Sequence, residues 1–298
     1  MEKLKKIDIH AHSNIYESIS PRYPYSGIPM ISPEKLLGFY DKLNIEKGVL
    51  LPLISPDATM QILTAEATKT AVDKYPDRFV WFCNVDARQY SIGKDGEPDY
   101  RYLIEHYKSL GAKGFGEFTT NLPVEDPRMQ RVFDICQELD LPVTIHISPA
   151  VGTSYGIVDD KGLPQIEKTL KKYPKLKILG HSQLFWTEIS KSEKRELYPW
   201  GKVEEGNLAR LLRDNENLLC DVSAGSGMRA FMRDPEYCAK FVEEFADRIF
   251  YGCDICAENN THPFAFEEFL DKMLDDKMIS LENYNKFVRL NAVKLLNL

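Results

Sequence analysis

Apolar, β-branched runs alternate with amphipathic segments along almost the whole chain, and this pattern predicts strands and helices in turn. Several strand-like runs, such as 49–53, are nearly continuously apolar, which is typical of parallel strands buried on both faces. Their starts lie about 30 to 40 residues apart, the length of a βα unit with modest loops. We predict eight strands: 5–12, 47–53, 79–86, 112–118, 142–147, 176–181, 217–222 and 248–254.

Segments with helical periodicity lie between these strands, and several begin or end at residues that mark helix boundaries. Ser32 and Pro33 suit the N-cap and the first position of the first helix, and Pro76 follows the end of the second. The predicted helices cover 33–40, 58–75, 100–110, 126–139, 164–173, 204–213, 235–245 and 263–275.

Strict alternation of strands and helices in one domain-sized chain favours a closed α/β architecture, the (β/α)8 or TIM barrel, over an open doubly wound sheet. The Gly-rich dinucleotide fingerprint that would favour the open sheet is absent from the sequence. No linker, repeat or low-complexity segment divides residues 1–298, so we expect a single domain. An extra amphipathic helix over 280–298 should pack on the outside of the barrel, and residues 13–32 should form a long loop on the substrate side.

Composition narrows the class of protein. The net charge of -7, the pI near 5.5 and the lack of a Lys/Arg cluster argue against a nucleic-acid partner. No apolar run has the length of a signal peptide or membrane span, so we expect a soluble cytoplasmic protein with no membrane partner. The six cysteines should be reduced; Cys253 and Cys256 match C-x-x-C but close an apolar run late in the chain, unlike a redox motif.

Four of the six histidines and one aspartate end predicted strands. His10 and His12 are two residues apart in the first strand and therefore point to one face, while His146, His181 and Asp254 end the fifth, sixth and eighth strands. In a TIM barrel all strands deliver their carboxyl ends to one mouth, where catalysis takes place. A lone strand-end histidine is more often a hydrogen-bonded structural group, but five such residues at one mouth favour a catalytic divalent cation.

This combination resembles the amidohydrolase superfamily, which carries H-x-H on strand 1, single histidines at the ends of strands 5 and 6, and an aspartate at the end of strand 8. Residues 7–12, 178–181, 251–254 and 291–296 are similar to the branch called amidohydrolase family 2, and the resemblance extends over nearly the whole chain. That branch contains metal-dependent hydrolases and non-oxidative decarboxylases such as aminocarboxymuconate-semialdehyde decarboxylase.

The resemblance implies roles for these residues. His10, His12, His146 and Asp254 would hold the metal, most often Zn²⁺, with Mn²⁺ or Fe²⁺ as alternatives and one or two ions per chain. His181 would be catalytic beside the substrate, support the ligands from behind, or bind a second ion. In hydrolytic members the strand-8 aspartate also takes the proton from the attacking water, which assigns Asp254 the role of general base.

Glu117 departs from the binuclear members of the superfamily, many of which carry a carboxylated lysine at the end of strand 4. Here Lys113 comes too early in its strand to reach the mouth, and Glu117 ends it. Glu117 has several open roles: it could bridge two metals, act as acid or base, or hydrogen-bond a ligand histidine. An ordinary carboxylate on the rim is the alternative.

Substrate contacts must come from the loops that follow the strands. Arg88 and Arg229 follow the third and seventh strands, and either could hold a substrate carboxylate as a bidentate pair, although a solvated loop charge is the simpler interpretation of each. Phe185 and Trp186 come directly after a strand-end histidine and could form a wall of the pocket.

Three further polar residues complete the candidates. His106 lies in a helix with charged neighbours and should face solvent, and His262 precedes a proline in a loop near the mouth, where a structural role is expected. Asp221 ends the seventh strand, and its role is open between structure and substrate contact.

These observations favour a hydrolase that activates water on a divalent cation to cleave an amide or ester/lactone bond of a small substrate. The alternative is a non-oxidative, metal-dependent decarboxylase of a small aromatic or unsaturated carboxylic acid, which uses the same ligands. A non-catalytic binding protein on the same barrel would be expected to lack a ligand, and none is missing from the sequence. We expect a small-molecule substrate as partner and leave open whether the chain forms a homo-oligomer.

Overall fold

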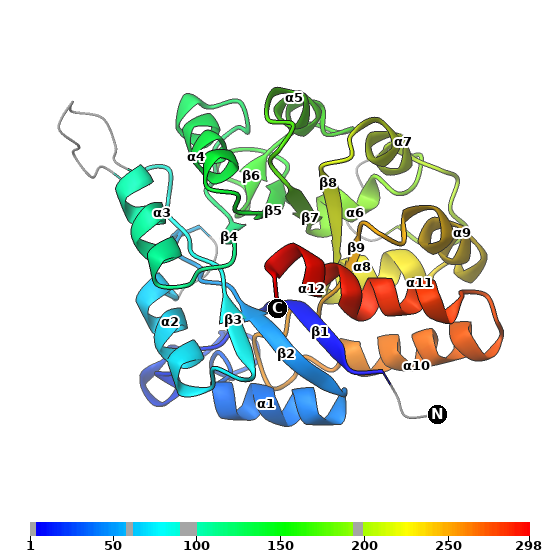
Figure 1. The fold of residues 1–298 in the computed structure, drawn as a ribbon, viewed down its shortest axis with the longest axis horizontal. Coiled ribbons are helices and arrows are strands. Elements are labelled where there is room, and N and C mark those ends of the chain that lie inside the picture. Colours follow the sequence, from blue (N-terminus) through cyan, green and yellow to red (C-terminus); the bar gives the residue numbers. More distant parts are fainter. Residues whose placement is uncertain (1–3, 58–61, 90–99, 193–198) are drawn as a thin grey trace.

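The computed structural model describes residues 4–57, 62–89, 100–192 and 199–298. In these ranges, eight parallel strands form the barrel and the helices lie around it (Figure 1). The barrel strands are β1 (Lys6–Ala11), β2 (Ile45–Leu50), β3 (Phe79–Trp81), β4 (Phe115–Phe118), β5 (Val143–Ser148), β7 (Ile178–His181), β8 (Leu218–Val222) and β9 (Ile249–Tyr251). The predicted (β/α)8 barrel is confirmed, and every predicted strand overlaps an observed one.

The barrel consists of two ladders joined by single bridges. Strands pair in the orders β1-β2-β3 and β4-β5-β7-β8-β9. Cys83, just after β3, bridges to Phe115, and Ala11 bridges to Ile255 beyond β9. The main-chain N–H of His12 also donates to the carbonyl of Ile255 at 3.2 Å. These bridges close the ring, while the two-residue strand β6 (Ile157–Val158), which the sequence did not predict, pairs with β5 outside it.

The outer helices follow the predicted order with small shifts at their ends. Helix α2 begins at Ala65 because the Thr64 side chain accepts a hydrogen bond from the Ala67 N–H at 3.1 Å, so the prediction of a start at residue 58 was early, and 58–61 lie outside the described residues. The outer helices are α1 (Pro33–Lys42), α2 (Ala65–Lys74), α3 (Tyr100–Ser109), α4 (Pro127–Glu138), α5 (Pro164–Lys172), α7 (Asn207–Asp214), α9 (Pro235–Phe245) and α10 (His262–Asp275).

Two helices that directly follow strands were not predicted, namely α6 (Gln183–Thr187) and α8 (Ala224–Met232). The first is only five residues long, and the second begins Ala-Gly-Ser-Gly, where helix propensity is low. Tertiary packing overrides that propensity in α8. A Cβ atom on Gly227 would come within 2.9 Å of the Val222 backbone, so the helix can approach the strand this closely only with glycine there.

The C-terminal segment differs from the prediction. Residues 280–298 form α11 (Leu281–Asn285), a π-helical turn η2 (Lys286–Leu290) and α12 (Asn291–Leu296) in place of one helix. Ala292 and Leu296 of α12 are buried against Ile7 of β1, Val49 of β2 and Phe250 of β9. The expected position on the outside of the barrel is therefore wrong for α12, which lies across the amino-terminal end of the barrel (Figure 1). Covering the apolar side chains at that end provides the physical reason.

Other expectations from the sequence agree with the structure. The segment 13–32 is a loop with one 3-10 turn, η1 (Glu17–Ile19). All six cysteines are free, so Cys253 and Cys256 form no disulfide with each other. Burial raises the pKa of Cys256 to about 12, which disfavours a reactive thiolate. Within the described ranges, no helix is long and apolar enough to cross a membrane.

Candidate metal centre

Five side chains meet at the carboxyl ends of the barrel strands. His10 lies in β1 and His12 directly after it, Glu117 lies in β4, His181 ends β7, and Asp254 follows β9. The three histidines and Glu117 are buried, whereas the Asp254 side chain is 24% exposed. Parallel strands of one barrel all end at the same mouth, which brings residues more than 200 positions apart together.

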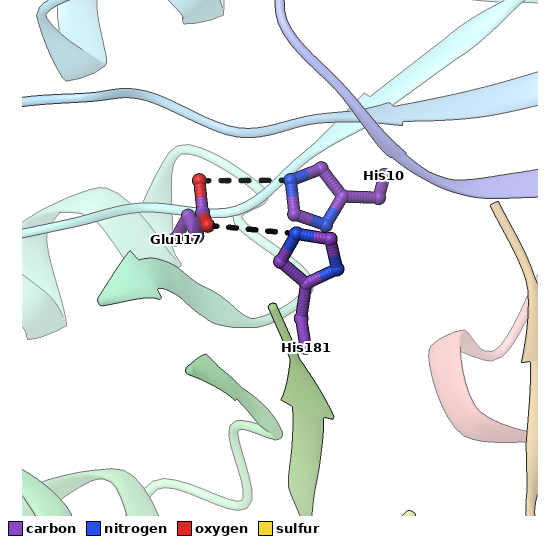
Figure 2. Close-up of side chains that lie close together, drawn as sticks. All are labelled: His10, Glu117 and His181. Carbon is purple, nitrogen blue, oxygen red and sulfur yellow. Dashed lines mark ion pairs between the residues drawn. The ribbon is translucent and has the colours of Figure 1, made fainter. Parts of the chain in front are cut away.

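Nitrogen and carboxylate atoms converge on one point at this mouth. The Nε2 atoms of His10 and His12 lie 3.1 Å apart. Glu117 Oε2 lies 3.6 Å and 3.3 Å from these two nitrogens, and Asp254 Oδ1 lies 3.8 Å and 3.5 Å from them. His181 Nε2 is 3.9 Å from an oxygen of each carboxylate. In Figure 2 the Glu117 carboxylate faces the rings of both His10 and His181.

These atoms form two overlapping groups that could hold a metal ion. In each group the ligand atoms all lie within 4.8 Å of one another; one group is His10, Glu117 and His181, and the other is His10, His12 and Asp254. Imidazole nitrogens together with carboxylate oxygens are the donors that Zn²⁺, Mn²⁺ and Fe²⁺ accept in proteins. The donor set therefore fits the divalent cation that the sequence predicted.

Each histidine of these groups has its Nδ1 atom occupied on the side away from the centre. Such outer hydrogen bonds fix the ring orientation and leave Nε2 to face the cation. The carbonyl of Leu51 can only accept, so the bond to it requires the proton of His12 to be on Nδ1. The three contacts are His10 Nδ1 to Asp221 Oδ2 at 2.6 Å, His12 Nδ1 to the Leu51 carbonyl at 2.8 Å, and His181 Nδ1 to Ser223 Oγ at 2.9 Å.

This arrangement favours a structural role for Asp221 over a substrate contact, because its buried carboxylate orients His10. The indole N–H of Trp186 donates to the Asp221 carbonyl at 3.0 Å and holds the backbone behind it. Neither Asp221 nor Ser223 was recognised as a partner of a histidine from the sequence. The only available signal was that Asp221 interrupts an apolar strand, where a carboxylate requires a hydrogen-bond donor.

His146 occupies a place different from the one expected. The Nδ1–H of His146 donates to Glu117 Oε1 at 2.6 Å, and its ring lies 4.3 Å from that of Tyr155. His146 thus contacts the centre through Glu117, and among the described residues it belongs to neither group of converging ligand atoms. For His181 the resemblance left three roles open: beside the substrate, behind the ligands, or as a ligand of a second ion. Its Nε2 lies among the converging atoms together with Glu117, the geometry that a ligand role requires of both residues.

The charges of the centre are strongly coupled. Burial lowers the pKa of His10, but the neighbouring carboxylates, Asp221 first and then Glu117 and Asp254, together outweigh this effect and raise the pKa well above its usual value. Burial opposes ionisation of Glu117, yet His146 and the other neighbouring histidines hold its pKa well below the usual range. Burial, followed by the charge on His10, lowers the pKa of His181 to about 4. Glu117, Asp221 and Asp254 place three carboxylates around these histidines, and a divalent cation would supply positive charge to balance them.

Asp8 is a buried carboxylate that sequence reasoning missed. Its Oδ1 accepts hydrogen bonds from the main-chain N–H groups of His10 at 2.9 Å and Cys253 at 2.8 Å, and its Oδ2 accepts from the Tyr40 hydroxyl at 2.7 Å. Asp8 therefore connects β1 with the end of β9 and with α1. Burial raises its pKa to about 7.

The predicted substrate arginines have other partners. Arg88 forms a bidentate pair with Asp86 at 2.9 Å and 2.6 Å, and its Nη2 also lies 2.5 Å from Asp57 Oδ2. Two carboxylates already neutralise this guanidinium, which argues against a role in holding a substrate carboxylate. The guanidinium of Arg229 lies 5.7 Å from the centre of the Trp200 ring.

Trp186 and Phe185 are buried core residues. Trp186 is 2% exposed and packs edge-on against Phe185 and Phe231, so it offers no open face to a substrate, and the expectation of a substrate contact is wrong. The ring of Phe185 covers Gly180, where a Cβ atom would lie 1.9 Å from it. An aromatic pair after a strand can equally be a core residue pair, and only packing distinguishes the two.

The two remaining histidines behave as expected. His262 Nε2 donates to the carbonyl of Cys253 at 2.8 Å, a structural contact at the start of α10. His106 is exposed on α3, where its ring stacks on Tyr102 at 6.4 Å.

The fold and the centre together define a TIM-barrel protein with a buried histidine–carboxylate cluster suited to a divalent cation. The chain belongs to amidohydrolase family 2, since the family model described as Amidohydrolase matches residues 7–298. Among curated protein sequences, none matches this chain.

Solved structures share the fold over nearly the full length of both chains. A probable 2-pyrone-4,6-dicarboxylic acid hydrolase from Acinetobacter baumannii is 15% identical with a TM-score of 0.62, covering 99% of this chain and 100% of that chain. An amidohydrolase from Burkholderia multivorans with bound Zn is 11% identical with a TM-score of 0.62, covering 99% and 100%. A 2,6-dihydroxybenzoate decarboxylase from Rhizobium is 16% identical with a TM-score of 0.57, covering 99% of each. Hydrolases and decarboxylases thus share this barrel.

Proposed function

We propose that the protein is a metal-dependent hydrolase that cleaves an amide or ester/lactone bond of a small substrate. One observation carries the proposal: Asp254, with a side chain 24% exposed, lies 3.8 Å from His10 Nε2 and 3.5 Å from His12 Nε2. It is the carboxylate of the cluster that substrate and water can approach most readily, since Glu117 and Asp221 are buried. A carboxylate beside a cation and open to the mouth suits proton abstraction from water.

The cation would be held by His10, His12 and Asp254, with His181 and Glu117 supported by the geometry and His146 by the family resemblance. Zn²⁺ is the first candidate, with Mn²⁺ or Fe²⁺ as alternatives, and Glu117 is placed to contact one ion or two. Such a cation, when bound, polarises a substrate carbonyl and lowers the pKa of a coordinated water toward neutrality.

The residues of the chain perform the remaining steps. Asp254 takes the proton from the attacking water and returns it to the leaving nitrogen or oxygen as the bond breaks. Asp221 and Ser223 keep His10 and His181 in the orientation that presents Nε2 to the centre. His146 keeps Glu117 ionised and oriented through the bond at 2.6 Å.

Metal analysis and product analysis test the proposal together. Purified protein is expected to contain one or two equivalents of Zn, Mn or Fe, and to release acid from members of a panel of small amides, esters and lactones with oxygen incorporated from labelled water. Asp254→Asn should lower turnover by about 10²- to 10⁴-fold, while the variant Asp73→Asn, at a 63% exposed side chain that pairs with Lys69, should keep it.

Other outcomes select the alternatives. Release of CO2 from small aromatic or unsaturated acids, with no uptake of water, would replace the hydrolase by the non-oxidative decarboxylase. Protein without stoichiometric metal, and with no activity that responds to His10→Ala, would indicate a binding protein on the same barrel. The cytoplasmic location and the lack of a nucleic-acid or membrane partner remain predictions from the sequence, which leaves the oligomeric state open.

A further inference from the structure

The amino-terminal end of the barrel, opposite the candidate metal centre, contains a cavity of about 660 Å³. Its wall is built from residues that directly precede barrel strands, such as Pro142 before β5, and from residues of α12 such as Leu295. Figure 1 shows α12 at this end, inside the ring of outer helices. The volume falls in the range of about 300–1,000 Å³ that small-molecule sites occupy.

Positive charge dominates the lining of this cavity. Three carboxylates, those of Asp140, Glu216 and Asp247, face it together with twice as many cationic side chains. The whole chain carries a net charge of -7, so the local excess runs against the overall balance. The cationic residues are Lys108, Lys113, Lys175, Lys177, Arg248 and Lys294.

Four of these lysines have amino groups that are unpaired within the described part of the chain. The amino groups of Lys113, Lys175, Lys177 and Lys294 form no ion pair or hydrogen bond with any other residue in the ranges that the structure describes. Many lysines elsewhere on the surface are paired; Lys168, for example, lies 2.9 Å from Glu125. Several unpaired cations around one hollow favour the approach of an anion.

Lysines are common near the carboxyl ends of helices, where they stabilise the helix, but this role does not explain Lys113 and Lys177. Lys108, in the last turn of α3, donates to the carbonyl of Leu139 at the end of α4 and so has a structural role. Arg248 donates to the carbonyl of Leu212. Lys113 and Lys177 instead lie just before β4 and β7, beyond the last turn of any helix.

The lysine amino groups and the apolar residues of this cavity together indicate which class of anion would bind there. Lysine binds phosphate as a compact point charge, and a phosphate group carries about -1.5 to -2 charge at neutral pH where a carboxylate carries one, which suits a cavity with several unpaired ammonium groups. The guanidinium of Arg248 already donates to a carbonyl. Leu219, Phe250 and Leu296 contribute an apolar floor. We propose that this cavity binds an organic phosphate, a phosphate-bearing small molecule whose apolar or aromatic body rests on that floor.

Isothermal titration of the full chain with ADP and with pyrophosphate tests this proposal. ADP combines two phosphates with an aromatic base, and pyrophosphate supplies the charge alone. We expect ADP to bind, and the double variant Lys113→Ala/Lys177→Ala to bind it about tenfold more weakly or worse, because charge-assisted contacts are lost. Leu295→Gln, at the half-buried edge of the floor, should weaken ADP more than pyrophosphate.

The matched control is Lys240→Ala/Lys272→Ala, which removes the same charge from exposed lysines outside the cavity; Lys272 also lies in the last turn of a helix. This control should bind ADP as the parent does, and so should Asp254→Asn. Thermal transitions of all variants establish that they are folded. The proposal would be overturned if both lysine double variants bound ADP equally well, or if the parent protein bound neither probe. It would also be overturned if Asp254→Asn lost ADP binding while Lys113→Ala/Lys177→Ala kept it.

Discussion

The two ends of the barrel solve opposite electrostatic problems. At the carboxyl end, histidines and carboxylates are buried and bond to one another, as in the 2.6 Å contacts of His10 with Asp221 and His146 with Glu117. At the amino end, lysines stand unpaired around a cavity while α12 supplies apolar cover. Because all strands run in the same direction, the candidate active site forms at their carboxyl ends, and the opposite end of the barrel closes the core. We therefore expect that substitutions at one end change activity and substitutions at the other end change stability.

The largest expected effect is at the carboxyl end. Asp254→Asn should lower kcat by about 10²- to 10⁴-fold, because a general base is lost beside the candidate metal ligands. Steady-state kinetics on whichever substrate the panel identifies, with metal content measured in parallel, provide the test. His106→Ala, which removes an exposed histidine from α3, should leave kcat unchanged. A variant Asp254→Asn with full activity would remove Asp254 from the mechanism.

A change at the amino end should affect stability without affecting the metal centre. Leu296→Ala removes a buried side chain that covers the barrel end and should lower the free energy of unfolding by about 2–5 kcal/mol. Urea denaturation measures the loss, and metal content per folded chain should not change. Leu298→Ala, at a more exposed neighbouring position, is the control. If Leu296→Ala also emptied the metal site, the two ends would not be independent.

The outer partner of His10 should have a smaller effect than the general base. Asp221→Asn removes the charge that orients and polarises the ring, and the affinity for the metal should fall by about 10- to 100-fold. In the metal-free protein the pKa of His10 should also move down, since Asp221 is the main group that raises it. Competition with a chelator measures the first quantity and NMR titration the second. Unchanged values of both would contradict the assignment.

The most gradual effect, spread over several pH units, concerns Asp8, which lies between the two ends. Burial raises its pKa from 3.8 to about 7 in the folded chain, so the folded state binds more protons than the unfolded state between these values. The stabilisation from the protonated form is complete below pH 4 and is lost as the pH rises toward 7. Metal-free parent protein should lose about 1 kcal/mol per pH unit in this window relative to Asp8→Asn. Parallel pH profiles of the two proteins would contradict the shifted pKa.

Sequence periodicity predicted the barrel and most of the centre because both depend on which residue ends a strand. His10, His12, His181 and Asp254 were identified from such positions, and parallel strands bring their ends together whatever the details of packing. Glu117 was recognised in the same way, with its role left open. The contact of His146 with Glu117, in place of a position among the converging ligand atoms, was not predictable from the sequence, because it depends on which ring atom turns toward which carboxylate.

Other features depend on contacts between distant segments. The residues around Arg88 in the sequence did not indicate that its guanidinium pairs with both Asp57 and Asp86. Likewise, the sequence after His181 did not show whether Trp186 lies in the core or at a substrate pocket. Local patterns record polarity and spacing, but they do not record the partner that a side chain finds across the fold.

Periodicity along the chain was enough to predict the barrel, the mouth at which the polar strand ends meet, and a set of side chains there suited to a divalent cation, because the order of strands and helices sets strand direction and parallel strands share one end. Three features became visible in the folded chain alone: Asp221, Leu51 and Ser223 orient the histidines, α12 covers the amino-terminal end, and lysines from separate loops and helices surround one cavity. Such contacts join residues far apart in the chain, and their geometry follows from side-chain packing within the closed barrel.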